Sequence, residues 1–122
     1  MSKHHPTDIQ LHRASRTLEI HFDDGVELVL PCEYLRVFSP SAEVRGHGLP
    51  EPLLVIGKHN VNIDAIEPVG QYAIKLVFDD GHDSGLYDWD FLYQLGQDYA
   101  LNWARYQARL ANHSSAQDES GF

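Results

Sequence analysis

The chain has 122 residues, 43% of them hydrophobic and 22% charged, which is the composition of one globular domain with a core of its own. Eighteen acidic and nine basic residues give a formal net charge of −9, whereas nucleic acids and anionic membranes are bound by clustered Lys and Arg. We therefore expect neither a nucleic acid nor a membrane as a partner, and the oligomeric state stays open.

The N-terminus and the single cysteine bear on the compartment. Residues 1–6 lack the apolar region of a signal peptide, and no apolar run has the ~20 residues that span a bilayer. Cys32 stands alone, so it cannot form an intrachain disulfide, and we expect it to be a small buried hydrophobe. These features predict a cytoplasmic protein with a flexible N-terminus at residues 1–6.

The first third of the chain predicts a three-stranded antiparallel meander. Apolar and polar residues alternate in three segments, at residues 8–12, 17–22 and 26–30. Asp24-Gly25 supplies the two positive-φ positions of a two-residue hairpin turn. Pro31 ends the third strand and suits the start of a short helix, which we predict over residues 31–38.

Residues 46–60 predict the longest loop of the chain, since three Gly and two Pro fall among these fifteen residues. Ser39-Pro40 ends the preceding helix and begins a further short turn over residues 41–45. The apolar run at residues 53–56 is expected either to anchor the loop in the core or to form a short edge strand.

The second half repeats the first in outline, with predicted strands at residues 61–66, 72–78 and 82–87. Phe78-Asp79-Asp80-Gly81 repeats Phe22-Asp23-Asp24-Gly25, and this match leaves both duplication and convergence on a favourable turn open. Asp88 is the expected N-cap of a long helix, which Gly96 is expected to kink or break. Beyond residue 112 the chain is polar, so we expect a disordered tail at residues 113–122.

Together these elements predict an α+β fold of two antiparallel β-meanders, with a short helix after the first and a long C-terminal helix after the second. A single domain is expected to occupy residues 7–112. The pattern alone leaves open whether the two meanders form one sheet or two.

His82-Asp83-Ser84 has the residue types of a nucleophilic triad without its geometry. Neighbours on a strand point to opposite faces, so His82 and Asp83 would diverge, and we interpret the three as polar turn and edge residues. His82 could instead bind zinc or iron if His47 and an acid of the turn come near, although no two histidines have the spacing of a metal motif. Because no acid–base pair is assembled, we expect that the protein is not an enzyme.

Three segments of the sequence carry a family resemblance: Ser39-Pro40-Ser41-Ala42-Glu43-Val44, Ile66-Glu67-Pro68-Val69-Gly70, and Phe78-Asp79-Asp80-Gly81-His82-Asp83-Ser84-Gly85. In these segments the chain resembles small bacterial proteins of unassigned function that are similar to the N-terminal domain of gamma-butyrobetaine hydroxylase. The resemblance covers about residues 7–96.

In the hydroxylase, this domain precedes the catalytic domain and carries a structural zinc held by three cysteines and one histidine. The resemblance places the four ligand positions of this chain at Ser39, Ser41, Val44 and His82. Serine hydroxyls and a valine cannot replace thiolates, so we expect no zinc and no other cofactor. The dioxygenase chemistry resides in a catalytic domain that this sequence does not contain, so the resemblance does not transfer it.

The leading hypothesis is a non-enzymatic accessory or protein-interaction domain. A similar domain is appended to some P-loop ATPases that act as iron–sulfur scaffold proteins, so the resemblance implies a link to iron–sulfur cluster metabolism. A metal-binding protein that uses His82, and His47 with it, is the second hypothesis, and a small-molecule enzyme is the third. The expected interaction surface, with another protein as the partner, consists of Ser39, Ser41, Glu43, His47, His82, Asp83 and Ser84.

Overall fold

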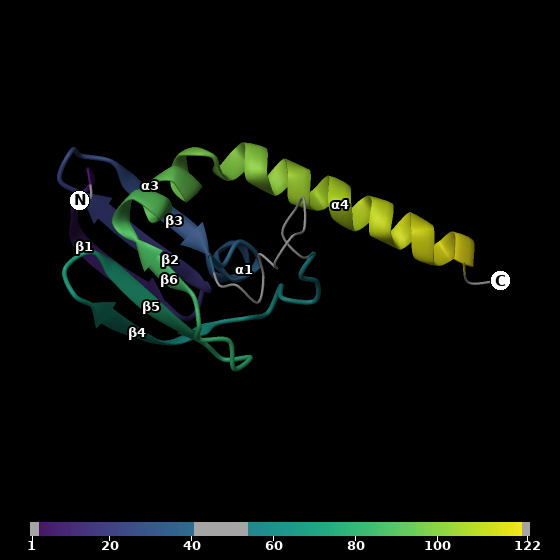
Figure 1. The fold of residues 1–122 in the computed structure, drawn as a ribbon, viewed down its shortest axis with the longest axis horizontal. Coiled ribbons are helices and arrows are strands. Elements are labelled where there is room, and N and C mark those ends of the chain that lie inside the picture. Colours follow the sequence, from purple (N-terminus) through teal and green to yellow (C-terminus); the bar gives the residue numbers. More distant parts are fainter. Residues whose placement is uncertain (1–2, 41–53, 121–122) are drawn as a thin grey trace.

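The computed structural model describes residues 3–40 and 54–120, and the side chains of residues 3–40 and 54–113. Two three-stranded antiparallel sheets form the body of the protein (Figure 1). The first sheet contains β1 (Pro6–His12), β2 (Thr17–Phe22) and β3 (Glu27–Pro31), and the second contains β4 (Ile63–Val69), β5 (Ala73–Phe78) and β6 (Leu86–Asp88). The helices are α1 (Cys32–Val37), α3 (Trp89–Gln97) and α4 (Tyr99–Ser120). This architecture confirms the predicted α+β class and settles that the meanders form separate sheets.

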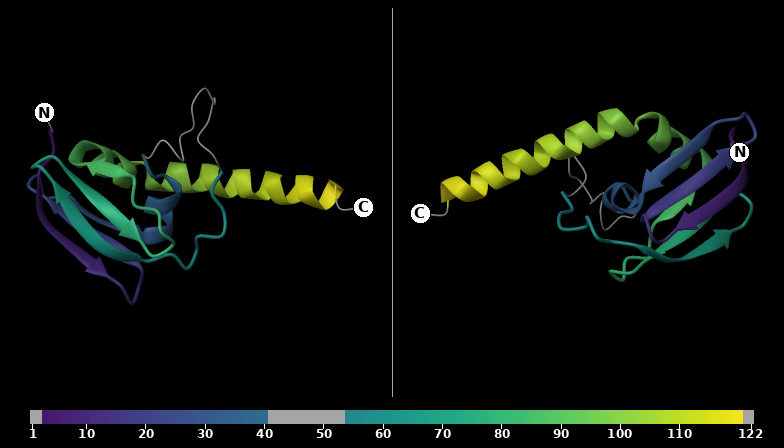
Figure 2. Two further views of the ribbon diagram at one scale, coloured as in Figure 1. Left: turned by 60° about the horizontal axis from the view of Figure 1, so that its bottom comes forward. Right: turned by 180° about the vertical axis from the view of Figure 1, so that it is seen from behind.

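The core lies between the two sheets and extends to the helices that follow them (Figure 2). The alternating apolar residues of β2 and β5 provide its centre, as the sequence predicts. A buried cluster joins residues of both sheets with residues of α1 and α3: Leu18, Ile20, Phe22, Leu28, Leu30, Tyr34, Leu35, Ile63, Ile74, Leu76, Phe78, Tyr87, Leu92 and Leu95.

The two sheets are built with the same register. Pro6 pairs with Phe22 in the first sheet, and Ile63 pairs with Phe78 in the second. The first strands therefore correspond at an offset of 57 residues, from 6 to 63, and the second strands at 56, from 22 to 78. Each first strand also shifts register directly after its first pair, between Pro6 and Asp8 and between Ile63 and Ala65. A shared irregularity at equivalent positions favours duplication of one unit.

The two Asp-Asp-Gly turns also agree with each other, but they differ from the prediction. Each is a three-residue loop, closed by one backbone hydrogen bond: the Phe22 N–H donates to the Val26 carbonyl in the first sheet, and the Phe78 N–H donates to the His82 carbonyl in the second. Only the glycine of each loop has a positive φ, 90° at Gly25 and 91° at Gly81. The expected two-residue turn was wrong because the aspartate before the glycine does not adopt the left-handed conformation.

Each helix contacts the turn of the opposite sheet. Arg36 of α1 donates from Nε to Asp80 Oδ2 at 2.8 Å, and Tyr93 of α3 donates from its hydroxyl to Asp24 Oδ2 at 2.8 Å. These residues are equivalent at the same offsets, 57 between the helices and 56 between the turns. The domain therefore consists of two equivalent β-β-β-α units, and the helix of each unit contacts the turn of the other. Convergence on a turn sequence alone would not produce these reciprocal contacts.

The strand predicted at residues 82–87 begins only at Leu86. Leu86 pairs with Lys75 as Val29 pairs with Glu19, so these positions are equivalent. The first unit has four residues from the end of the turn to this pair, residues 26–29, and the second has five, residues 82–86. The additional residue interrupts the strand pairing of residues 82–85.

The two ends of the chain also differ from expectation. Residues 3 and 4 are held, since the backbone N–H groups of Lys3 and His4 donate to Asp90 Oδ1 at 2.9 and 3.0 Å. α4 continues to Ser120, past the point where the sequence predicts a disordered tail, and projects away from the two sheets (Figure 1). The expected break near Gly96 is confirmed, because α3 ends at Gln97 and α4 begins at Tyr99.

Candidate functional site

A buried polar pair lies where the end of α1 meets the turn between β5 and β6. Ser39 Oγ and His82 Nε2 are 2.9 Å apart, and the two residues are 1% and 7% exposed. The interpretation of His82 as a polar edge residue was therefore wrong. His82 directly follows the three-residue loop and takes the inward position that Val26 occupies in the first unit.

The equivalent place in the first unit has no polar pair. Gly96 stands at the position of Ser39, and Leu28 stands at the position of Gly85, both at an offset of 57. A Cβ added to Gly96 would lie 2.4 Å from Leu28 Cδ1, and one added to Gly85 would lie 2.5 Å from Ser39 Oγ. Both units thus pack a helix end closely against a strand. The contact is apolar in one unit and polar in the other.

Tyr87 of β6 extends the buried pair. Its hydroxyl donates to the Leu35 carbonyl of α1 at 2.7 Å. Tyr87 is completely buried, and this burial raises the pKa of its phenol well above the ordinary value, against the opposing effect of the Ser39 hydroxyl. The neutral phenol therefore serves as a fixed hydrogen-bond donor to α1 inside the domain.

Asp80 joins the buried pair to the charged surface. Its carboxylate accepts from Arg36 Nε at 2.8 Å, from Lys58 Nζ at 2.7 Å and from the backbone N–H of His82 at 3.1 Å. Burial alone would raise the pKa of this carboxyl, but the three donors outweigh it and lower the pKa to about 2. The Asp80 side chain is only 18% exposed, and its hydrogen bonds and ion pairs link α1, the segment at Lys58 and the turn.

The remaining predicted site residues fall into two groups. Asp83 and Ser84 are exposed beside the buried pair. The other predicted positions lie outside the described residues: Ser41, Glu43, Val44 and His47.

The described part of the site does not suit a metal. Ser39 and His82, the two described family ligand positions, are hydrogen-bonded directly to each other, and a neutral hydroxyl is a poor zinc ligand. Among the described side chains, of residues 3–40 and 54–113, no group of three or more His, Cys, Asp or Glu is arranged to hold a metal ion. Cys32 is buried as expected, and burial raises the pKa of its thiol to about 11, which keeps it unreactive.

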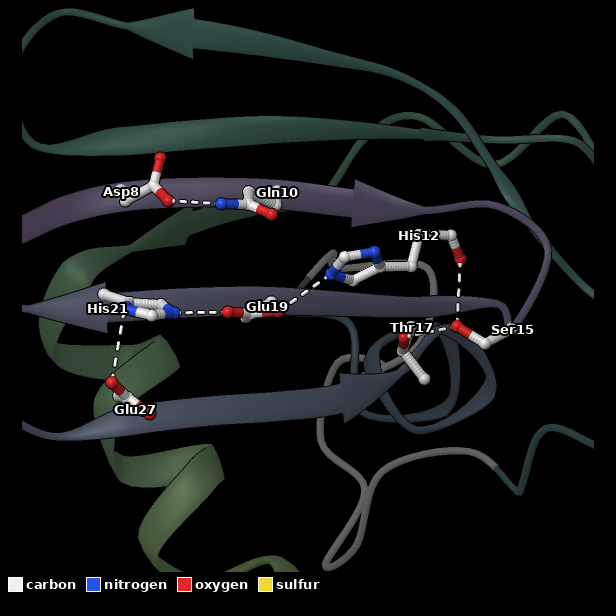
Figure 3. A network of polar contacts seen from close by, with 8 residues as sticks. All are labelled: Asp8, Gln10, His12, Ser15, Thr17, Glu19, His21 and Glu27. Atoms are coloured by element: carbon white, nitrogen blue, oxygen red, sulfur yellow. Dashed lines mark hydrogen bonds and ion pairs between the residues drawn. The ribbon is translucent and has the colours of Figure 1, made fainter.

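A second polar network covers the outer face of the first sheet (Figure 3). Glu19 lies between two histidines: its carboxylate contacts His12 Nε2 at 2.8 Å on one side and His21 Nε2 on the other. Hydrogen bonds from His21 and His12 lower the pKa of Glu19, and the bond to Glu19 raises the pKa of His21. The sequence analysis assigned no role to these histidines. The cluster could have been found from the sequence, because His12, Glu19 and His21 occupy the outward-facing positions of two predicted neighbouring strands.

None of the described helices combines the length and the apolar character that a membrane crossing requires.

Comparison with known proteins gives the relatives of this chain. Residues 9–93 match the sequence profile described as gamma-butyrobetaine hydroxylase-like, N-terminal. Two proteins with NMR solution structures are 55% and 51% identical and cover 93% of this chain; the matches span 84% and 89% of those chains, each with a TM-score of 0.80. A protein of unknown function from Acidithiobacillus ferrooxidans, which belongs to the DUF971 family, is 35% identical over 75% of this chain and 91% of its own, with a TM-score of 0.63. No curated protein matches the chain.

Proposed function

This chain belongs to the gamma-butyrobetaine hydroxylase-like N-terminal family, and from that premise we propose that it is a non-enzymatic accessory domain that binds another protein. The binding surface in this proposal lies around the Ser39–His82 pair and includes the exposed residues Asp83 and Ser84. The relative from Acidithiobacillus ferrooxidans is itself of unknown function, so the proposal depends on this chain's own residues.

The observation that carries the proposal is the difference between the two equivalent ends of the domain. The end with Val26 and Gly96 packs with apolar groups, which shows that this fold needs no buried polar group there. The end with His82 and Ser39 holds a buried polar pair instead. Replacing both partners of a buried hydrogen bond by apolar groups of the same shape can be neutral or stabilising, so a polar pair that the fold does not require points to a specialised surface.

The charges beside the pair indicate what kind of partner fits. Asp79 and Asp83 are exposed on this turn, and the whole chain carries a net charge of −9. Among the described residues, the nearby cations Arg36 and Lys58 both contact Asp80 and are largely buried. The described part of the exposed surface is therefore acidic, and a partner with a basic surface complements it.

The proposed setting follows from family resemblance alone. Similar domains are joined to iron–sulfur scaffold ATPases, and we place the accessory role of this chain in cytoplasmic iron–sulfur cluster metabolism by that analogy. The alternative of a metal-binding protein with His82 as a ligand has a direct test. Elemental analysis of the untagged protein should find less than about a tenth of an equivalent of zinc or iron, and a stoichiometric amount would favour the alternative.

Affinity capture with matched variants tests the interaction surface. The baits are the wild type, Asp83→Arg, and Glu27→Arg, which makes the same charge change beside the equivalent turn at the other end of the domain. We expect one or more proteins to be enriched by the wild type and by Glu27→Arg, and to fall about tenfold with Asp83→Arg. Equal capture by all three baits, or no specific capture by the wild type, would contradict the proposed surface.

A further inference from the structure

We propose that the outer face of the second sheet binds a second copy of this chain, so that the protein forms a symmetric dimer through β4, β5 and β6. The inference goes beyond the proposed function, because it concerns this face and not the surface around Ser39 and His82. It follows from comparing the outward-facing residues of the two equivalent sheets and from the way in which those of the second sheet are paired.

The outer face of the first sheet is polar. Six polar side chains occupy the outward-facing positions of β1 and β2: Asp8, Gln10, His12, Thr17, Glu19 and His21. Hydrogen bonds join neighbouring members of this set (Figure 3). An antiparallel sheet with such a face is typical of one that is covered by water.

The equivalent face of the second sheet is largely apolar. Where the first sheet has Asp8, His12, Thr17 and His21, the second has Ala65, Val69, Ala73 and Val77. Leu86 of β6, which corresponds to Val29, is 48% exposed. No described helix lies over the outer face of β4 and β5 (Figures 1 and 2). The first sheet shows that the fold does not require an apolar outer face, so we infer that a partner covers this one.

The charges of this face indicate that the partner is a second copy. Glu67 and Lys75 are directly opposite each other on β4 and β5, and Lys75 Nζ lies 3.2 Å from Glu67 Oε1. Two identical chains of net charge −9 repel each other on average, so they associate most readily through a face on which an acid and a base are balanced. A basic partner would instead be attracted to the acidic turn around Asp83.

The strand pairing makes the face complementary to itself. A two-fold axis that runs along the strands, midway between β4 and β5, places β4 of one copy opposite β5 of the other. Glu67 of each copy then lies opposite Lys75 of the other copy. The same axis places Ala65 opposite Val77, since these two residues are also a direct pair, so a small side chain meets a larger one. One symmetry operation therefore matches both the charges and the side-chain sizes.

The area of the face sets the expected strength of the dimer. β4 has seven residues, so at ~3.3 Å per residue and ~4.8 Å between strands the three strands cover roughly 300 Å² on each copy. A stable interface buries about 800 Å² on each partner. We therefore expect a weak dimer, with a Kd of roughly 0.1–1 mM.

Translational diffusion of the full chain, measured by NMR from ~0.05 to ~2 mM, spans this range of Kd and tests the proposal. After correction for viscosity, the diffusion coefficient of the wild type should fall with concentration towards that of a particle of twice the mass. Leu86→Lys should weaken the association about tenfold or more, because it places a charge in the interface. Val29→Lys is the matched control, since it makes the same change at the equivalent position of the first sheet, where the side chain is 58% exposed. It should leave the association as in the wild type.

Charge reversal tests the identity of the partner. Lys75→Glu leaves two acids at the centre of the face, and Glu67→Lys leaves two lysines. Each variant alone should lose about tenfold or more in self-association, because like charges then face each other. An equimolar mixture of the two should associate at least as strongly as the wild type, since each acidic face meets a basic one. Mixing would not repair a defect in the folding of either chain.

Three results would overturn the proposal. The first is the diffusion coefficient of a monomer throughout the wild-type series, and the second is an equal effect of Leu86→Lys and Val29→Lys. The third is a mixture of the charge variants that does not associate although both keep the circular dichroism of the wild type. If a charge variant does not fold, the comparison of Leu86→Lys with Val29→Lys decides, since both positions are exposed. Affinity capture with the Asp83→Arg bait can fail while the dimer forms as proposed, so the two failures are distinguishable.

Discussion

Replacing Gly96 by Ala tests the close packing between α3 and β3. In an exposed helix this substitution stabilises by about 1 kcal/mol, because Ala is the better helix former. Here the new Cβ would lie 2.4, 2.5 and 2.9 Å from Cδ1, Cδ2 and Cγ of Leu28. Rotating the two methyl groups does not move Cγ, so the strand or the helix must shift. Overpacking of this kind costs about 1–3 kcal/mol, and we expect a net loss of about 1–2 kcal/mol.

The sign of the effect should reverse when Leu28 is made small. Leu28→Ala alone should lower the free energy of unfolding by about 2–4 kcal/mol, since Leu28 is buried. In that background the three atoms nearest to the new Cβ, which all belong to Leu28, are removed, and the helix propensity of Ala should raise stability by about 0.5–1 kcal/mol. The four proteins form a double-mutant cycle with a coupling energy of about 2 kcal/mol.

Urea unfolding of the four proteins, followed by circular dichroism, measures the cycle, with unchanged m-values as the check that two-state unfolding holds. A stabilising effect of Gly96→Ala in both backgrounds would refute the packing argument. A destabilising effect in both would show that Gly96 is needed for the break between α3 and α4, independently of Leu28.

Three further predictions concern the site and the histidine network. His82→Ala should lower the free energy of unfolding by about 1–3 kcal/mol in urea titrations, because it leaves a cavity and removes a buried hydrogen bond to Ser39. His82→Val should lower it less than His82→Ala does, since valine fills more of the cavity, yet should equally lose the captured partner. NMR titration should find the pKa of His21 above its ordinary value of 6.5, and Glu19→Gln should lower that pKa. Because the pKa is raised in the folded protein, the His21–Glu19 contact should stabilise the fold below pH ~6.5. This stabilisation should fade as the pH rises through the folded pKa of His21. Asp80 has a depressed pKa of about 2, so its contribution is present above pH ~4 and is lost as the pH falls towards 2, and Asp80→Asn should abolish that part of the acid transition.

Much of the fold could be predicted because it depends on local patterns. The alternation of Leu18, Ile20 and Phe22 specifies a strand with one buried face, and β2 has that face buried in the structure. Asp88 accepts from the Phe91 N–H at 2.7 Å, as expected of a helix N-cap. The Asp-Asp-Gly sequences predicted the places of the turns correctly, but they did not predict the size of the loops. Two-residue and three-residue hairpin loops both place a glycine at a left-handed position, so the glycine does not distinguish them.

The candidate site could be predicted only in outline. Two of the named positions, Ser39 and His82, do meet, but their burial and their bond to each other were not anticipated. The reason is one additional residue between His82 and β6, which delays β6 to Leu86 and interrupts the alternation, so that His82 and Tyr87 both face the core. A single-residue shift of this kind reverses which side chains face the core, and it becomes visible only when the two units are compared pair by pair.

By itself, the amino-acid sequence determined the class of the protein, the order of its elements and the places of its turns, because these follow from the spacing of apolar residues and from glycine. Only the tertiary structure decided that the two units exchange contacts, with each helix docked on the opposite turn. It also decided that Ser39 and His82, 43 residues apart, share one buried hydrogen bond. Such a pair depends on how α1 and the second sheet pack together, and no local pattern in the chain encodes that distance.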